Sequence, residues 1–296
     1  MVTPPDIPDW LARLYPFSPR KFLTPAGATM SYLDEGPRHD EAVLMLHGNP
    51  TWSFYYRNLM HAVRAKLRCI VPDHIGMGLS EKPPGYDYTL ARRIDDVAAL
   101  ITMLGLKRVH LVVHDWGGAI GFGFAAKHPE LIGRIVILNT AAFASPNIPA
   151  RIALCKLPLL GPLLVRGLNG FAWPATWMAM NARPLTTDEK RAYLFPYDSW
   201  GNRIAVSEFV RDIPLSPSHR SWATLAAVEQ GLAQFKNHPT AIVWGLKDFC
   251  FNQSFLDRWM AIYPDAAKAA FHQAGHYLLE DSPEALAFVT ARLTEA

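Results

Sequence analysis

A chain of 296 residues is long enough to form one large domain, or one domain with a sizeable insertion. Half of its residues are hydrophobic and 19% are charged, which is typical of a globular protein. The formal net charge of +3 is small and the basic residues are scattered, so we expect no binding of nucleic acid.

The cysteines and the apolar segments indicate where the protein works. The three cysteines are odd in number and widely spaced, so they predict no disulfide framework and favour the reducing cytoplasm. The N-terminus lacks the charged start and apolar core of a signal peptide. The most apolar stretch, residues 157–165, is interrupted by Pro158, Gly161 and Pro162, so we expect no transmembrane helix.

Strand and helix patterns alternate through the first 139 residues. We expect a proline-rich segment over residues 1–19 to lie extended on the surface, followed by two strands around a turn at 26–27. Further strands are predicted at 42–46, 68–71, 109–113 and 134–138, with helices at 53–66, 90–104 and 116–128. This alternation predicts an α/β protein, with a mostly parallel sheet covered by helices on both faces.

The pattern changes at about residue 140. The next ninety residues show helical patterns, many Pro and aromatic residues, and no clear strand. Strands then return at 241–244 and 268–272, with helices at 255–263 and 283–293. We therefore predict a core domain made of residues 1–139 and 231–296, and an inserted helical cap domain over 140–230. A site between the two would lie at the carboxyl ends of the strands.

The strongest local signal is the stretch from Val109 to Gly118. A mostly β-branched run predicts a buried strand, and the glycines after it allow a helix to pack close to that strand. The residue at the tip of such a turn projects from the sheet edge, among helix N-terminal N–H groups. This residue is Asp115, so we predict a carboxylate nucleophile that attacks carbon and forms an ester. The alternative is that Asp115 only caps its helix.

Two residues after later strands complete a candidate triad. His276 would act as a base, and Asp248 would orient it. Nucleophile, acid and histidine then follow the chain order of the α/β-hydrolase fold. Taken singly, Asp248 also fits a turn-stabilising carboxylate and His276 a loop histidine.

Two side chains near the predicted nucleophile could stabilise a leaving group. Trp116 offers an indole N–H and Asn49 an amide, and neutral donors in a dry pocket suit a soft anion or a carboxylate. The alternatives are wall packing for Trp116 and a turn residue before Pro50 for Asn49. The sequence shows no metal-ligand spacing and no nucleotide-binding fingerprint, so we expect neither metal nor cofactor.

Four motifs resemble the haloalkane dehalogenase family of α/β-hydrolases. The resemblance implies that Asp115 is the nucleophile and His276 the base, with Asn49 and Trp116 as leaving-group donors. It places the acid on Asp248, as in the third branch of the family. The motifs are His-Gly-Asn-Pro-Thr-Trp at 47–52, His-Asp-Trp-Gly-Gly at 114–118, Trp-Gly-Leu-Lys-Asp at 244–248 and Gly-His-Tyr at 275–277.

Longer stretches at 72–78, 138–143, 196–200 and 211–215 resemble the β-lactone decarboxylases of bacterial long-chain olefin biosynthesis, which belong to that branch. This resemblance implies conversion of a cis-3-alkyl-4-alkyloxetan-2-one to a cis-alkene and CO2, and an assembly with other enzymes of that pathway. We expect a pocket for a small hydrophobic substrate with two alkyl chains. Apolar cap residues would line it or merely pack the cap: Trp173, Trp177, Met178, Met180 and the leucines of 157–168.

Three other functions stay open. A haloalkane dehalogenase ranks second, because it would use the same residues. An epoxide hydrolase ranks third, with Tyr193 and Tyr197 as its pair of cap tyrosines. A ligand receptor of the hydrolase fold is disfavoured by the intact set of Asp115, Asp248 and His276.

Overall fold

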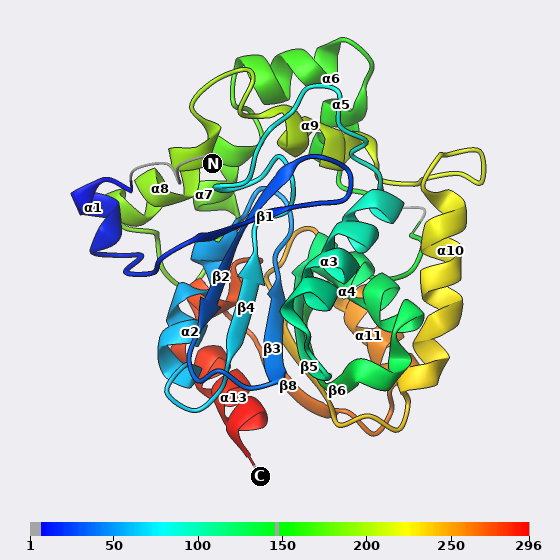
Figure 1. The fold of residues 1–296 in the computed structure, drawn as a ribbon. Helices are drawn as coiled ribbons and strands as arrows, with labels where there is room; N and C mark the ends of the chain where they lie inside the picture. Colours follow the sequence, from blue (N-terminus) through cyan, green and yellow to red (C-terminus); the bar gives the residue numbers. More distant parts are fainter. Residues whose placement is uncertain (1–6, 146–147, 296) are drawn as a thin grey trace.

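One eight-stranded sheet forms the centre of the computed structural model, which describes residues 7–145 and 148–295 (Figure 1). The strand order is β1-β2-β4-β3-β5-β6-β7-β8. β2 pairs antiparallel with β1 and with β4, and every pairing from β4 to β8 is parallel. The strands are β1 (Arg20–Leu23), β2 (Thr29–Glu35), β3 (Glu41–Leu46), β4 (Cys69–Pro72), β5 (Arg108–Asp115), β6 (Ile132–Thr140), β7 (Thr240–Gly245) and β8 (Ala267–Phe271).

Helices cover both faces of this sheet, because alternate residues of the buried strands point to opposite sides. Leu111 and Val113 of β5 pack into one core cluster, and Val112 packs into the other. The helices of the first cluster are α3 (Leu90–Leu104), α4 (Trp116–Lys127), α10 (Trp222–Gly231) and α11 (Gln253–Ile262). Those of the second are α2 (Arg57–Val63), α12 (Leu278–Asp281) and α13 (Pro283–Thr294). The predicted α/β-hydrolase architecture is confirmed.

Between β6 and β7 the described residues form helices and no strand. Five of these helices lie together at one end of the molecule, beyond the carboxyl ends of the strands (Figure 1). They are α5 (Ala150–Lys156), α6 (Leu160–Pro162), α7 (Ala172–Met178), α8 (Thr187–Leu194) and α9 (Ile204–Arg211), with a π-helical turn η3 (Leu163–Gly167) between α6 and α7. We call residues 148–221 the cap region. Since α10 packs against α3 and α4, we propose that an inserted domain would end before it.

The N-terminal segment differs from the prediction. Residues 9–12 form a short helix, α1 (Asp9–Ala12), where an extended surface chain was expected. Leu11, Tyr15 and Phe17 are buried, and the hydroxyl of Tyr15 lies 2.6 Å from that of Ser53. The apolar side chains of this segment thus bury themselves against the second core cluster instead of remaining in water. Residues 1–6 lie outside the described residues.

Candidate active site

β5 ends in a strained turn at Asp115. This residue has φ 52° and ψ −127°, a conformation that non-glycine residues adopt rarely and at a cost. The hydroxyl of Thr140 holds the turn by donating to the Asp115 carbonyl oxygen. A Cβ at Gly117 would lie 1.9 Å from the Leu46 carbonyl oxygen, and one at Gly118 would lie 2.0 Å from Thr140 Oγ1. Glycines are therefore required for α4 to start this close to the neighbouring strands.

Two backbone N–H groups bind the Asp115 carboxylate, one of them at Oδ1. The N–H of Asn49, in the loop after β3, donates to Oδ1 at 2.6 Å, and the Trp116 N–H at the start of α4 also donates to this carboxylate. The close approach of the loop needs a glycine, because a Cβ at Gly48 would lie 1.9 Å from Oδ1. The loop after β3 and the α4 N-terminus thus orient the predicted nucleophile together.

The structure brings the three predicted triad residues together. His276, in the loop after β8, donates from Nδ1 to Asp248 Oδ2 at 2.7 Å. Its Nε2 lies 3.7 Å from Asp115 Oδ2. The other oxygen of Asp248 accepts the backbone N–H groups of Cys250 at 2.6 Å and Phe251 at 3.0 Å, which fixes the carboxylate. All three triad side chains are buried.

Burial and charge shift the pKa values of the two groups that would react. Burial raises the pKa of Asp115, against the lowering effects of His276 and of the Asn49 and Trp116 N–H groups. Burial by itself would lower the pKa of His276, but the charge and hydrogen bond of Asp248, with the charge of Asp115, raise it. The protonation of Asp115 therefore affects that of His276, and the reverse.

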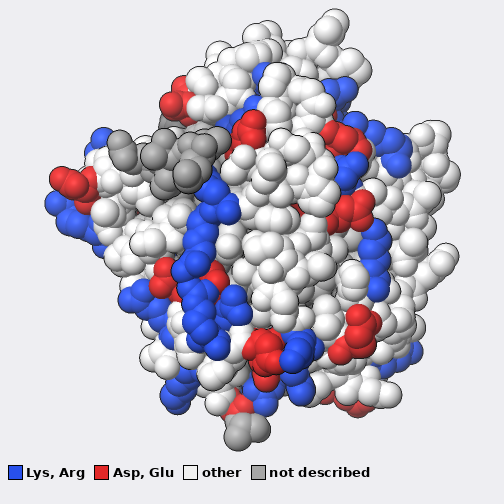
Figure 2. Space-filling view, viewed as in Figure 1, with Lys and Arg blue, Asp and Glu red and all other residues white. Residues whose placement is uncertain are grey.

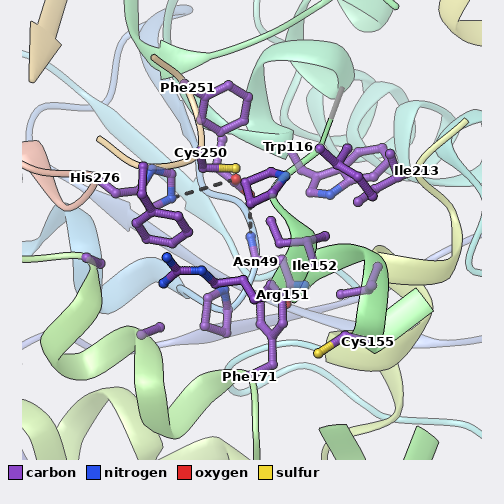
Figure 3. Close-up of a pocket in the computed structure, with 18 of the residues that line it drawn as sticks. Asn49, Trp116, Arg151, Ile152, Cys155, Phe171, Ile213, Cys250, Phe251 and His276 are labelled. Carbon is purple, nitrogen blue, oxygen red and sulfur yellow. Dashed lines mark hydrogen bonds and ion pairs between the residues drawn. The ribbon is translucent and has the colours of Figure 1, made fainter. Parts of the chain in front are cut away.

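Both predicted leaving-group donors line one cavity. The indole Nε1 of Trp116 has no hydrogen-bond partner among the described residues, and the ring packs 5.4 Å from Phe209. The Asn49 amide nitrogen donates to the Val206 carbonyl oxygen at 3.0 Å, and its second hydrogen has no recorded acceptor in the described chain. In Figure 3, Asn49, Trp116 and His276 surround the same end of the cavity.

The cavity has a volume of about 360 Å³ and is lined mainly by apolar side chains from strand ends and from the cap region. Ile152, Cys155 and Phe171 lie opposite the catalytic end (Figure 3), and Trp177 and Met178 also line it. For several apolar cap residues, lining was one of two alternatives, and these do not line the cavity: Trp173, Met180 and the leucines of 157–168. Most of these leucines point to solvent, because they lie on the outer side of the segment that follows α5, and only its opposite side faces the cavity.

Sequence reasoning missed Ser145, Arg151 and Cys250 among the polar cavity residues. Arg151 of α5 stacks its guanidinium 4.6 Å from the Phe249 ring centroid, and no acidic side chain of the described residues forms an ion pair with it. Cys250 lies two residues after Asp248, and burial raises the pKa of its thiol. The spacing from Asp248 could have located Cys250, but nothing in the sequence places Arg151 over the site.

Two polar residues near the strand ends have structural contacts. Asn139 donates from its amide to the Gly245 carbonyl oxygen at 3.0 Å and accepts the Gly245 N–H at 2.8 Å, so it ties β6 to β7. His114 donates from Nε2 to the carbonyl oxygen of His276 at 2.8 Å. That bond supports the loop that carries the predicted base.

The tyrosines proposed for epoxide opening lie outside the cavity. The hydroxyl of Tyr193 donates to Glu280 at 2.6 Å, and that of Tyr197 donates to the Thr51 carbonyl oxygen at 3.3 Å. Both side chains are buried and neither lines the cavity. The pair expected for an epoxide hydrolase is therefore wrong, because both hydroxyls already bind protein groups.

Fold and site define a class of protein. A family model described as the alpha/beta hydrolase fold matches residues 41–283, and the chain belongs to this family. A cis-3-alkyl-4-alkyloxetan-2-one decarboxylase of Shewanella oneidensis is 46% identical, over 96% of this chain and 91% of that protein. The decarboxylase of the same name from Xanthomonas campestris is 45% identical, over 92% of this chain and 94% of the relative.

Solved structures of dehalogenases share the fold. The crystal structure of haloalkane dehalogenase DbeA from Bradyrhizobium elkani superimposes with a TM-score of 0.84 at 28% identity, covering 93% of this chain and 96% of that one. The resemblance to haloalkane dehalogenases and β-lactone decarboxylases is thus confirmed.

Two features are absent from the described residues. Residues 7–145 and 148–295 contain no helix long and apolar enough to cross a membrane. Over the same residues, no three His, Cys, Asp or Glu side chains gather in the way that metal ligands do.

Proposed function

We propose that the protein is a β-lactone decarboxylase, which converts a cis-3-alkyl-4-alkyloxetan-2-one to a cis-alkene and CO2. The observation that carries the proposal is the identity of 45–46% to two decarboxylases over nearly their whole lengths. The site supports it, because a buried carboxylate nucleophile faces an apolar cavity that suits two alkyl chains.

The first step is attack by Asp115 on the ring carbon that bears the lactone oxygen. A bond forms between an Asp115 carboxylate oxygen and this carbon, the carbon–oxygen bond of the ring breaks, and its electron pair leaves on a substrate carboxylate. Asn49 and Trp116 lie where their N–H groups can hold that anion. Arg151 is the one Lys or Arg residue in the described cavity lining, and its positive charge would also attract the carboxylate anion.

The second step releases the enzyme without water. The bond between the substrate carboxylate and its carbon breaks, CO2 leaves, and the electron pair forms the alkene while the Asp115 carboxylate departs. Inversion in the first step followed by anti elimination in the second keeps both alkyl groups on one side, so a cis-lactone gives a cis-alkene. No proton transfer is needed, so His276 and Asp248 orient and balance the charge of Asp115 without acting as a base.

The haloalkane dehalogenase function is the second candidate, favoured by the structural likeness to DbeA and by the Asn49–Trp116 pair. In that reaction Asp115 would form an alkyl ester, and water activated by His276 would hydrolyse it. Product analysis by gas chromatography, after incubation with a cis-β-lactone and separately with 1,2-dibromoethane, distinguishes the two. We expect alkene from the lactone; alcohol from the dibromide, with the lactone untouched, would favour the dehalogenase.

Location and partners extend this proposal. Three free cysteines fit the cytoplasm, where we place the protein. We also propose, from the resemblance alone, an assembly with the enzyme that forms the lactone. Co-elution of the two purified proteins in size-exclusion chromatography tests this, and independent elution at all concentrations would contradict it.

A further inference from the structure

The outer surface of the cap region is unusually apolar. Eight of the twelve large hydrophobic side chains classed as exposed in the described chain belong to residues 154–177. Leu159 is 89% exposed and has φ 63°, a conformation that leucine rarely adopts, and Leu168 is 70% exposed. Single exposed apolar residues are ordinary, but a contiguous group marks a binding surface. We call this group the outer patch: Leu154, Leu157, Leu159, Leu160, Leu163, Leu168, Trp173 and Trp177.

The elements that carry the outer patch adjoin one another. α6 packs against α5 and against η3, and the rings of Trp173 and Trp177 lie 5.8 Å apart on α7. α5 and α6 form the end of the molecule farthest from the C-terminus (Figure 1), and Figure 2 shows mostly uncharged side chains over that end. The residues on α5, α6 and η3 thus form one apolar group, and α7, which follows η3 in the chain, touches α5 where Arg151 Nη1 lies 3.2 Å from Met178 Sδ.

The outer patch is continuous with the wall of the cavity. On α5, Ile152 and Cys155 line the cavity while Leu154 points to solvent, as does Leu157 directly after the helix. Trp177 does both, since it lines the cavity and is half exposed. An apolar molecule bound against the patch would thus lie one side chain away from the cavity.

The charged side chains on the elements that carry the outer patch are basic. The sequence contains no Asp or Glu between Glu130 and Asp188, whereas α5 and η3 carry Arg151, Lys156 and Arg166. Lys156 donates to backbone carbonyl oxygens and Arg166 donates to that of Trp200, and none of the three forms an ion pair within the described residues. Asp212 and Glu208 lie near enough to act on Lys156 and Arg166, so their charges are partly compensated. Arg151 is the exposed cation without an acidic partner in the described residues, and its charge suits an anionic surface.

We propose that the outer patch docks this protein on the surface of an anionic phospholipid bilayer, with the cavity facing the lipid. Leu and Trp side chains would enter the boundary between headgroups and acyl chains, and the basic side chains would meet the phosphates. The combination of Trp, Leu and unpaired cations favours lipid over a protein partner, whose interface core is depleted in charge. Building on the proposed function, a lactone with two alkyl chains would then enter from the bilayer.

Vesicle flotation tests the docking without any substrate. The protein is mixed with vesicles of phosphatidylcholine, with or without phosphatidylglycerol. We expect binding to the anionic vesicles that weakens at high salt, and at least about tenfold weaker binding for the double variant Leu159→Glu, Leu168→Glu. Leu23→Glu is the matched control, because Leu23 on β1 is 67% exposed, close to the 70% of Leu168, and lies outside the cap region. This variant should bind as the wild type does.

Turnover separates this proposal from the proposed function. With a short-chain, water-soluble β-lactone, the double variant should keep the wild-type rate; with a long-chain lactone held in anionic vesicles, its rate should fall. Wild-type protein that stays unbound by both kinds of vesicle would overturn the docking, as would equal binding by the double variant. Self-association that the double variant abolishes, without vesicle binding, would assign the patch to a second copy of the chain. None of these results bears on the lactone chemistry, which is tested separately by product analysis.

Discussion

The imidazole Nε2 of His276 lies 3.7 Å from Oδ2 of Asp115, which is too far for a hydrogen bond. Oδ1 of the same carboxylate, by contrast, is held by the Asn49 N–H at 2.6 Å. The two oxygens of the predicted nucleophile therefore differ: one is fixed by the backbone, and the other is left for substrate. We expect Oδ2 to attack, while Oδ1 stays in its N–H contacts as the ester forms.

The donor roles can be tested at Trp116. Trp116→Phe removes the indole N–H and keeps most of the ring, so it should lower kcat for lactone turnover by about 10²–10³, as for the loss of one oxyanion-type donor. Asn49→Ala should have a similar effect, with some loss of stability because Asn49 also binds Val206. Steady-state kinetics on both variants measures this. Wild-type rates in both variants would show that these side chains only line the cavity and do not stabilise the leaving group.

His276 should matter less for a lactone than for a haloalkane. Removal of a general base costs about 10²–10⁴ in rate, so His276→Ala should lower alkene formation by less than about 10² if no base is needed. With a haloalkane, the same variant would stop at the ester, visible by mass spectrometry as a heavier peptide containing Asp115. An ester that accumulates from the lactone instead would show that water is needed to complete that reaction.

The pH dependence should follow Asp115. Burial raises the pKa of this carboxylate, so activity should fall as the pH drops through a value above that of an ordinary aspartate. The pKa of His276 is also raised, which means that its neutral form is lost at a higher pH than usual. Ester hydrolysis needs that neutral form and would fail first on acidification. We therefore expect the pH profile of kcat for the lactone to extend to lower pH than the profile of kcat for haloalkane hydrolysis; coincident acid limbs would contradict this.

Asn139 should be important for stability. Asn139→Ala removes both of its bonds to Gly245 and leaves the buried Gly245 N–H without a partner, whereas the Gly245 carbonyl oxygen keeps the Asp248 N–H at 3.3 Å. One such unpaired group costs about 1–3 kcal/mol, so the free energy of unfolding should fall by about that amount. Urea denaturation measures the change. An unaltered unfolding midpoint would indicate that water replaces the side chain.

The sequence predicts the centre of this molecule better than its surface. Asp115, Asp248 and His276 were found because each follows a buried strand, and parallel strands end at one edge of a sheet. The cap region was predicted as helical, yet which side of each helix faces the cavity was not. Leu159 and Trp177 have similar hydrophobicity, so only the packed structure separates a surface side chain from a cavity wall. Arg151 was missed for the same reason: its position depends on how α5 packs over the strands.

The central claim is that Asp115 opens a β-lactone and leaves without the help of water. Incubation of the enzyme with a cis-β-lactone in ¹⁸O-labelled water, followed by gas chromatography and mass spectrometry, tests it most directly, with Asp115→Ala as the inactive control. We predict that the wild-type enzyme forms a cis-alkene that carries no oxygen, and that the variant forms none. A β-hydroxy acid labelled with ¹⁸O as the main product, with little alkene, would contradict the claim, because water would then have opened the ring or its ester.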